Sequence, residues 1–352
     1  MNKPSSALPA DPTSQEARRP RRASGHITLK QLAERLGVTK VTVSRALNHP
    51  HLVSPETLRR VQEAVRETGY IPNLVAGSLA SNRSHLVVAL VPNIGGTVFQ
   101  ETMEAMTATL RQRGYQLLIG QSSYDEAQEE PLIEEVLGRR PAGVVLTGVL
   151  HSGKTRQLLQ ASEIPVVETW DLTPQPIDML VGFSHDAVGR AAAEYLCQAG
   201  TRPVAVITPD DRRAMTRAHA FRDAVRRLAD MEVPILPVAA PTRLGDGRRA
   251  LQELLARQPD LGAVFCAADS LALGVLIEAR SRAIRVPEQL RVLGYGDLAF
   301  AVDTDPPLST VRIDGSRIGA LAASMLMDRI EGKAVAQPVV DVGFQLIERA
   351  ST

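Results

Sequence analysis

The segment ITLKQLAERLGVTKVTVSRALNHP, residues 27–50, combines two short helical patterns with a turn between them. Apolar residues recur at helical spacing in 29–36, and Gly37 interrupts the pattern. Thr39 belongs to a residue type that caps helices, and a second helical pattern follows over 40–47. Two helices separated by a glycine turn are typical of a helix-turn-helix motif.

The spacing of Ala33, Gly37 and Val43 supports this interpretation. A small residue lets the helices approach, glycine permits the turn, and an apolar residue packs the second helix on the first. A third helix is expected between Ser54, which can cap it, and Gly69, which can end it. The alternative is a small helical bundle with a solvated basic face.

Positive charge is concentrated at the front of the chain. Residues 1–84 hold thirteen of the 40 Lys and Arg but only six of the 39 Asp and Glu, so the remainder is acidic. A basic end on an acidic body indicates a polyanionic partner. Four residues of the second helix are expected to point outward: Lys40, Val41, Ser44 and Arg45. Such side chains can contact guanine edges and thymine methyl groups in the DNA major groove.

Two domains are therefore expected at the front. Residues 26–71 are predicted to form a helix-turn-helix DNA-binding domain. Residues 1–25 are rich in Pro, Ser and Ala and lack apolar periodicity, so they are predicted to be a disordered basic tail. The arginines of this tail either contact phosphates or are simply solvated.

From His85 onward, apolar strand-like runs alternate with amphipathic helical stretches. The predicted strands lie at 85–93, 115–120, 142–148, 164–170, 177–183, 202–209, 233–238, 261–268, 290–297 and 339–347. Nearly continuous apolar strands separated by helices predict doubly wound α/β sheets, which are parallel and covered on both faces. About ten strands exceed what one such sheet usually holds, so we expect two lobes with a cleft at the carboxyl ends of the strands.

Several classes of protein are not expected. Cys197 and Cys266 each lie in an apolar run, which indicates buried thiols in a reducing compartment and no disulfide. No apolar run approaches the length of a membrane span and the N-terminus lacks a secretory signal, so a cytoplasmic protein without a membrane partner is predicted. The seven histidines include no metal-ligand spacing, and hydrolase and dinucleotide motifs are missing. We expect neither an enzyme nor a cofactor or metal.

One motif opposes that expectation. GVLHSGKT, residues 148–155, fits the P-loop pattern G-x-x-x-x-G-K-[ST] and lies between an apolar run and a helical pattern. In a P-loop enzyme this segment would cradle a nucleotide. The usual partner of a P-loop is an aspartate at the end of an apolar strand, and no apolar run here clearly ends in one. AVFCAAD is nearest, but its Asp269 opens a helix. A nucleotide-binding enzyme with a DNA-targeting head, using Gly148–Thr155, is the alternative.

Residues 27–81 strongly resemble the DNA-binding region of the LacI family, and the resemblance extends from Thr28 to Ile347. Within that family, the segments GVTKVTVSRAL, PVVETWD, IDMLVGFSH and GAVFCAADSLALG are most similar to the repressors of gluconate-utilisation operons. The resemblance implies a body similar to periplasmic sugar-binding proteins, with two doubly wound parallel sheets behind a three-helix head. The body spans 85–350, with a first lobe of 85–183 and 312–337 and a second lobe of 184–311 and 338–350.

The resemblance also implies which residues contact DNA. Lys40 and Val41 take the two positions that mainly set base preference. Within the hinge or linker segment 72–84, residues 73–80 match a hinge helix, which orders when two copies meet on DNA, and Leu79 matches a leucine that wedges into the minor groove. A plain linker is the alternative for 72–84. The complete expected set is Thr28, Leu29, Thr39, Lys40, Val41, Thr42, Ser44, Arg45, Asn48, Asn73, Ala76 and Leu79.

Effector-binding residues are expected where predicted strands end. The set is Asn93, Phe99, Thr147, Glu168, Trp170, Phe183, Arg217, Asp269 and Asp297. By resemblance Arg217 contacts the ligand, and its guanidinium would suit the carboxylate of a sugar acid, although an internal carboxylate is the alternative partner. Trp170 either stacks on a sugar ring or packs in the core, and Asp269 either binds ligand or caps its helix. Many relatives carry polar side chains at the positions of Ala268 and Gly296. Their absence here weakens the hypothesis that the effector is a neutral sugar.

We therefore expect a transcriptional regulator, and specifically a repressor, of carbohydrate or sugar-acid catabolism. A homodimer would place two recognition helices in successive major grooves of a near-palindromic operator. A small sugar or sugar-acid effector such as gluconate or 6-phosphogluconate would change the operator affinity. A third hypothesis, a sugar-binding protein without DNA function, is opposed by residues 26–80.

Overall fold

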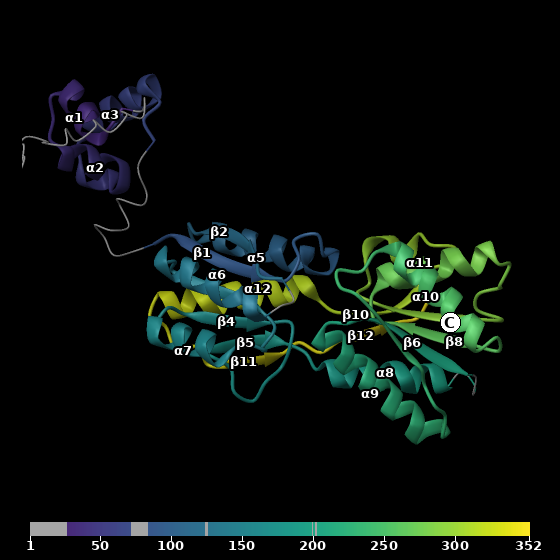
Figure 1. Cartoon of the computed structure of the whole chain (residues 1–352). Helices are drawn as coiled ribbons and strands as arrows, with labels where there is room; N and C mark the ends of the chain where they lie inside the picture. Colours follow the sequence, from purple (N-terminus) through teal and green to yellow (C-terminus); the bar gives the residue numbers. More distant parts are fainter. Residues whose placement is uncertain (1–26, 72–83, 124–125, 199, 201–202) are drawn as a thin grey trace, which may run out of the picture. The chain divides into compact units, whose positions relative to one another are not determined.

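In the computed structural model, the 352-residue chain is described over residues 27–71, 84–123, 126–198, 200 and 203–352. It divides into two compact units, one ending at Asn82 and one beginning at Arg83 (Figure 1). The expected hinge segment, apart from Ser84, lies outside the described residues, and so do its predicted DNA contacts Asn73, Ala76 and Leu79.

The N-terminal unit, as far as it is described, contains helices α1 (Leu29–Leu36), α2 (Lys40–Asn48) and α3 (Pro55–Thr68) and the 3₁₀ turn η1 (Pro50–Leu52). The hydroxyls of Thr28, Thr39 and Ser54 cap the three helices by accepting hydrogen bonds from backbone N–H groups three residues later. Gly37 and Gly69 end α1 and α3 with φ of 67° and 62°, a conformation that glycine adopts without steric cost. The predicted three-helix arrangement is confirmed.

The three helices share one apolar core. Its buried members are Leu32, Ala33, Val43, Ala46, Val61, Ala64 and Tyr70. Ala33 and Val43 come from α1 and α2, as the spacing of the motif predicts. Such a small core can hold short helices together because each helix contributes one apolar face to it.

The first lobe of the C-terminal unit is built on a six-stranded sheet in the order β11-β5-β4-β3-β1-β2, with every pair parallel. Its strands are β1 (Leu86–Val91), β2 (Gln116–Gln121), β3 (Gly143–Thr147), β4 (Val166–Thr169), β5 (Met179–Gly182) and β11 (Val339–Asp341). Its helical elements are η2 (Thr97–Phe99), α5 (Gln100–Gln112), α6 (Glu126–Gly138), α7 (Gly153–Ser162) and α12 (Gly315–Ile330).

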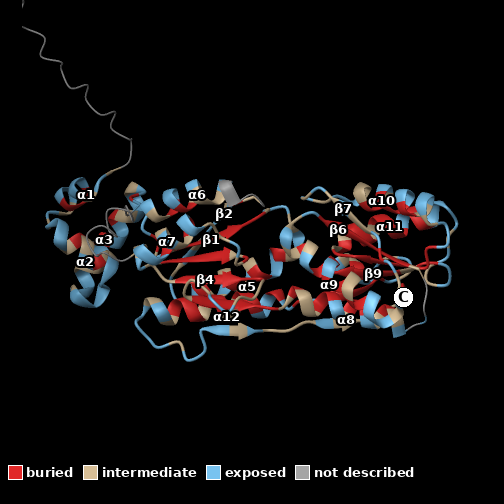
Figure 2. Cartoon of the chain, turned by 60° about the horizontal axis from the view of Figure 1, so that its bottom comes forward, coloured by how far each residue is buried: buried red, intermediate tan, exposed pale blue. Residues whose placement is uncertain are grey.

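Helices cover both faces of this sheet. Val87 and Ala89 of β1 pack in the cluster that contains α5 and α12, whereas Val88 and Leu90 pack in the cluster that contains α6 and α7. Successive side chains of a strand point to opposite faces, so an unbroken apolar strand is required when both faces are covered. Figure 2 shows the central strands in the buried colour.

The second lobe repeats this plan on a sheet in the order β12-β10-β9-β8-β6-β7, parallel except for the β10–β12 pair. Its strands are β6 (Val204–Pro209), β7 (Ile235–Val238), β8 (Ala263–Cys266), β9 (Arg291–Tyr295), β10 (Ser309–Arg312) and β12 (Gln345–Ile347). Its helical elements are α8 (His185–Gln198), α9 (Arg212–Ala229), α10 (Leu244–Arg257), α11 (Asp269–Ser281) and η3 (Ala299–Val302). Helices α8 and α9 cover one face, and α10 and α11 cover the other.

The prediction of one strand over 339–347 is wrong. A turn at Gly343, with φ of 68°, divides the segment, and its N–H donates to the Asp341 carboxylate at 2.8 Å. The first part, β11, pairs with β5 of the first lobe, and the second part, β12, pairs with β10 of the second lobe. Residues 338–341 therefore lie with the first sheet, not with the second as expected.

Strand β10 was not predicted, because two of its three buried positions are polar and only Val311 is apolar. Ser309 and Thr310 are fully buried. Their hydroxyls are satisfied by hydrogen bonds, with Thr310 Oγ1 donating to Asp269 Oδ1 at 2.7 Å and Ser309 Oγ lying 2.7 Å from Thr352 Oγ1. Buried hydroxyls with partners cost little, but they remove the apolar signal on which strand prediction depends.

Glycines allow the covering helices to pack closely in pairs. A Cβ added at Gly189 of α8 would lie 2.3 Å from the Arg217 carbonyl oxygen of α9. Additions at Gly274 of α11 and Gly319 of α12 would lie 2.2 Å from carbonyl oxygens of α10 and α5 respectively. Each of these helix pairs can pack this closely only because glycine has a hydrogen atom where every other residue has a Cβ.

Within the described residues, none of the helices combines the length and apolar content that crossing a bilayer requires. Cys197 and Cys266 are free thiols, partly and fully buried respectively.

Candidate functional sites

Helix α2 has one buried face and one exposed face. Val43 and Ala46 are buried in the core of the N-terminal unit, whereas Lys40, Val41 and Arg45 are exposed. Val41 is a large apolar residue that is 57% exposed, which leaves its side chain available for an apolar contact. This face has the composition that major-groove recognition uses: cationic donors beside a small apolar side chain.

Other predicted DNA contacts also have structural partners. The Thr39 hydroxyl caps α2 and lies 2.9 Å from Thr42 Oγ1. Asn48 is exposed, and its Nδ2 donates to the Oγ of half-buried Ser44 at 3.3 Å. Thr28 caps α1, and Leu29 is half-buried against the core. Contacts of these residues with DNA stay predictions.

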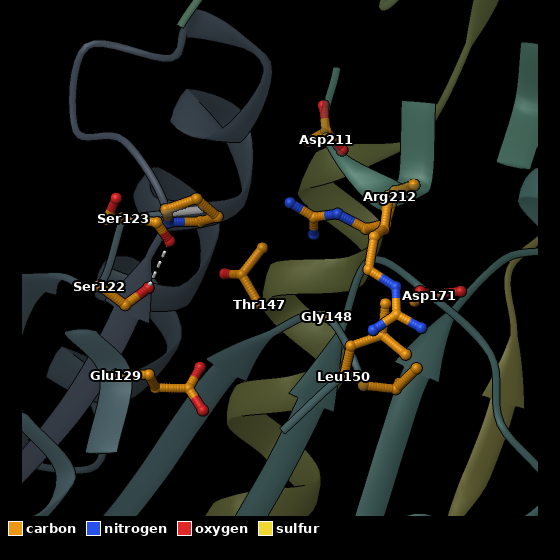
Figure 3. Close-up of a pocket in the computed structure, with 12 residues that line it drawn as sticks. Ser122, Ser123, Glu129, Thr147, Gly148, Leu150, Asp171, Asp211 and Arg212 are labelled. Atoms are coloured by element: carbon orange, nitrogen blue, oxygen red, sulfur yellow. Dashed lines mark hydrogen bonds between the residues drawn. The ribbon is translucent and has the colours of Figure 1, made fainter. Parts of the chain in front are cut away.

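A cavity opens between the two lobes of the C-terminal unit, at the carboxyl ends of the first-lobe strands. It contains about 540 Å³ of unoccupied space, part of it open to solvent. Its lining residues are Pro92, Ser122, Ser123, Glu129, Thr147, Gly148, Val149, Leu150, Asp171, Asp211, Arg212 and Arg213. Figure 3 shows Ser122 and Glu129 on one side and Asp211 and Arg212 on the other, with Thr147 between them. This is the place where open α/β sheets bind ligands.

Of the predicted effector residues, Thr147 lines the cavity and the aromatic ones do not. Trp170 is buried, and its Nε1 donates to Thr102 Oγ1 at 3.2 Å. The rings of Phe99 and Phe183 lie edge-on to the Trp170 ring, at centroid distances of 5.0 and 5.9 Å. The aromatic residues therefore form the packed floor beneath the cleft.

Glu168 belongs to a buried cluster of charges beside the cavity. His151 Nδ1 lies 2.7 Å from the Glu129 carboxylate, and its Nε2 lies 3.2 Å from the Gly148 carbonyl oxygen and 3.5 Å from Glu168. Burial by itself lowers the pKa of His151, but the hydrogen bond and charge of Glu129, with the charge of Glu168, raise it above the ordinary value overall. Arg156 Nη1 lies 3.7 Å from Glu168. These pairings hold the loop after β3 in place.

Two of the three guanidinium nitrogens of Arg217 have hydrogen-bonding partners. Its Nη1 lies 2.9 Å from His185 Nδ1, its Nη2 donates to the Ala267 carbonyl at 3.1 Å, and its Cζ lies 3.9 Å from the Tyr295 ring centroid. Burial, followed by the charges of Arg217 and Arg213, holds the pKa of His185 well below its ordinary value. A neutral His185 that donates through Nε2 to the Trp170 carbonyl at 2.9 Å can accept from Arg217 through Nδ1.

The remaining predicted effector residues also lie outside the cavity lining. The Asp297 carboxylate is 2.7 Å from Arg349 Nη2, and Asn93 Oδ1 accepts from the Gly95 N–H at 2.9 Å. Asp269 is buried at the start of α11, where it accepts from the Leu298 N–H at 2.8 Å and from the Thr310 hydroxyl. These side chains stabilise loops and strands of the lobes.

Removing the charge of Asp269 is expected to change how stability depends on pH. Burial raises the pKa of Asp269 from 3.8 to about 6. Between these values the folded state binds more protons than the unfolded state, so this group lowers the unfolding free energy as pH rises, by about 3 kcal/mol in all. Asp269→Asn cannot ionise and should lack this contribution.

Urea unfolding of the wild type and of Asp269→Asn at pH 4.5, about 6 and 8 measures the effect. The unfolding free energy of Asp269→Asn relative to that of the wild type should rise as pH rises. Asp303→Asn, which removes an exposed carboxylate of the same lobe, controls for the loss of one charge. A difference that stays constant with pH would contradict the prediction.

Several cavity residues were missed by sequence reasoning. Ser122 follows β2 and Asp171 follows β4, so the strand-end rule could have found both. Arg213 lies in the first turn of α9, after β6, where DDRR gives the signal of two adjacent cations. The resemblance instead implied that Arg217, one helical turn later, contacts the ligand.

The segment Gly148–Thr155 has the strand–loop–helix context of a P-loop, but its side chains are arranged differently. Ser152 caps α7 by accepting from the Thr155 N–H, which is an amide that a phosphate would need. Lys154 pairs with Glu130 and, at 3.0 Å, with Glu134 of α6. Carboxylates beside the loop oppose the binding of a polyphosphate. The geometry therefore does not favour the nucleotide-binding alternative.

Comparisons with known proteins match both units. Residues 28–73 match the family model described as bacterial regulatory proteins, lacI family, and residues 193–352 match a periplasmic binding protein-like domain. The chain is 40% identical over 334 residues to the HTH-type transcriptional regulator GntR of Pseudomonas aeruginosa, covering 94% of this chain and 97% of that protein. It is 30% identical to the HTH-type transcriptional regulator IdnR of Escherichia coli over 91% of this chain and 97% of that one.

Solved structures agree with these matches. A LacI-family transcriptional regulator from Silicibacter pomeroyi superimposes with a TM-score of 0.86 at 31% identity, covering 92% of this chain and 99% of that one. The transcription regulator GntR from Chromobacterium violaceum gives a TM-score of 0.73 at 35% identity, over 76% and 98% of the respective chains. With its capped helix-turn-helix unit and its two-lobed parallel α/β body, this chain belongs to the LacI family of DNA-binding transcriptional regulators.

Proposed function

We propose that this protein represses genes of sugar-acid catabolism and releases its operator when it binds a sugar acid such as gluconate or 6-phosphogluconate. The observation that carries the proposal is the 40% identity, over nearly the whole chain, to a regulator named GntR. The second relative, IdnR, and the sequence segments that resemble gluconate-operon repressors support the same class of effector.

The composition of the cavity supports a ligand of this class. Sugar hydroxyls donate well to carboxylates, and Glu129, Asp171 and Asp211 line the cavity. Arg212 and Arg213 supply cations that attract an acid group. A polyhydroxylated acid needs both kinds of partner, whereas a neutral sugar needs only the first.

A second copy of this chain completes the DNA-binding form in this proposal. A near-palindromic operator presents two half-sites, so two α2 helices related by a twofold axis can enter successive major grooves. The edge strand β2 carries exposed apolar side chains, Leu118 at 46% and Ile119 at 39%. Ile94, whose N–H donates to Gln121 Oε1 at the end of β2, is 62% exposed. Exposed apolar side chains on a strand at the edge of a sheet are more stable when a partner protein covers them.

Effector binding between the lobes provides the switch. The cavity takes residues from both lobes, so a ligand that contacts both changes how they close on each other. In a dimer, closure alters the spacing of the two DNA-binding units and therefore the operator affinity. The same coupling free energy weakens effector binding when DNA is present.

Titration of gluconate or 6-phosphogluconate against an operator complex tests the proposal. An operator fragment is selected from a genomic pool with the full chain, and its binding is followed by fluorescence anisotropy. We expect saturating effector to weaken operator binding by about 10- to 100-fold, the usual range of such coupling. Operator affinity that stays constant across a panel of sugar acids would remove this effector class, and an increase would make the ligand a co-repressor.

A further inference from the structure

We propose that Arg213, and not Arg217, binds the acid group of the effector and thereby selects a sugar acid over a neutral polyol. The inference rests on the proposed function, because it names the residue that reads the charge of that effector.

Arg213 presents an unsatisfied donor at the cavity. It lines the cavity one helical turn before Arg217 on α9. In the part of the chain that the structure describes, its Nη1 is buried and has no hydrogen-bond partner. A buried guanidinium N–H without an acceptor is unfavourable, and an anion that enters the cavity would supply the acceptor.

The loop after β3 leaves room for this guanidinium. Gly148 has a φ of 102°, and a Cβ built on it would lie 3.5 Å from Arg213 Nη1. The Arg213 Cζ also lies 5.8 Å from the centroid of the Phe99 ring. The guanidinium therefore extends from the second lobe to the backbone and aromatic floor of the first lobe.

Arg217 is a weaker candidate, because its contacts are with the protein itself. Two of its nitrogens already bond to His185 and Ala267, and its guanidinium stacks on Tyr295. Its Nε has no partner among the described residues, but Arg217 is not part of the cavity lining. Arg217 therefore holds the wall of the second lobe in shape.

The three carboxylates of the cavity do not occupy the Arg213 donor. Asp211 caps α9 by accepting from the Ala214 N–H at 3.1 Å, and Glu129 pairs with His151. Asp171 accepts from the Leu172 N–H at 2.8 Å. Burial raises the pKa of Asp171 in spite of the nearby charges of Arg213 and Arg217. The carboxylates can still accept ligand hydroxyls, so the cavity fits a polyol that carries one anion.

Binding at Arg213 also explains how the ligand could bridge the lobes. Arg213 belongs to the second lobe, whereas Ser122 and Thr147 belong to the first. A sugar acid can place its acid group on Arg213 and its hydroxyls on the first lobe. The neutral polyol lacks the first of these anchors and should close the lobes less effectively.

Calorimetric titration of the full chain with gluconate and with glucitol tests the proposal, because glucitol has an alcohol where gluconate has its carboxylate. The wild type should prefer gluconate, and Arg213→Gln should lose about 10- to 100-fold in gluconate affinity with little change for glucitol. Arg213→Lys should recover only part of this, because an ammonium cannot match a carboxylate with two parallel donors. Arg222→Gln removes a cation of α9 that does not line the cavity, and it should behave as the wild type.

The outcomes separate this inference from the proposed function. If gluconate binds and Arg213→Gln keeps the wild-type preference over glucitol, the role of Arg213 is overturned and the effector class stands. If the wild type binds no sugar acid, the effector class fails, and inorganic phosphate at constant ionic strength becomes the probe. Phosphate should then raise the melting temperature of the wild type but not of Arg213→Gln, and equal shifts would overturn the anion site. Circular dichroism establishes that each variant is folded.

Discussion

Exchanging Arg45 for glutamate is expected to weaken operator binding by at least about 100-fold while the protein stays folded. Arg45 is exposed on α2, between the buried residues Val43 and Ala46. Losing one arginine contact to a base or phosphate costs about 1–3 kcal/mol, and a carboxylate in its place adds repulsion from the DNA backbone. The buried face of α2 is unchanged by the exchange, so the core of the N-terminal unit should persist.

Anisotropy with the selected operator, at two salt concentrations, measures this effect. Arg45→Gln should fall between the wild type and Arg45→Glu, because it removes the charge without reversing it. Arg66→Glu introduces the same charge change on the exposed surface of α3 and should cost only a few fold. Arg45→Glu that binds within about threefold of the wild type would refute the assignment of α2 as the recognition helix.

Replacing Gly319 by alanine is expected to destabilise the C-terminal unit by about 3 kcal/mol. The new Cβ would lie 2.2 Å from the Thr102 carbonyl oxygen and 3.1 Å from the Met106 backbone nitrogen. These are backbone atoms of α5, so a side-chain rotation cannot relieve the clash and the two helices must separate. Overpacking of this kind costs typically 1–3 kcal/mol and occasionally more.

The displacement should also reach the cavity floor. Thr102 Oγ1 accepts from Trp170 Nε1 and donates to the Gly315 carbonyl at 2.9 Å. Moving α5 away from α12 disturbs both bonds, so Gly319→Ala should also weaken effector binding.

Denaturant unfolding of the full chain measures the loss of stability in Gly319→Ala. The matched control is Gly138→Ala at the end of α6, where nothing lies within 4 Å of an added Cβ. That variant should be neutral or stabilised by up to about 1 kcal/mol, because alanine has the higher helix propensity. If the two variants changed the unfolding free energy equally, close packing of α5 and α12 would not explain why position 319 requires glycine.

The DNA-binding unit could be predicted from the sequence because its determinants are local. The caps Thr28, Thr39 and Ser54 act on amides three residues away, and Gly37 and Gly69 end helices through their own φ angles. Interactions over so few residues are visible in the order of the chain.

The cavity between the lobes was predicted in position but not in composition. The ends of parallel strands predicted a cleft at this edge of the first sheet, and Thr147, expected there, lines the cavity. The direction of each side chain was not predictable, since Trp170 and Phe183 turn into the core while Asp171 turns to the cavity. The angle at which a chain leaves a strand depends on what packs beneath it.

The sequence by itself determined the family, the capped three-helix unit, the two doubly wound sheets and the exposed face of α2. These follow from residue types at short spacing, which restrict the backbone locally whatever the remainder of the chain does. Only the tertiary structure decided that Arg217 is engaged within the second lobe and that 339–347 is divided between two sheets. It also decided that Arg213 Nη1 has no hydrogen-bond partner among the described residues. These outcomes depend on contacts between residues far apart in the chain, because a side chain's partners are fixed only when the elements pack.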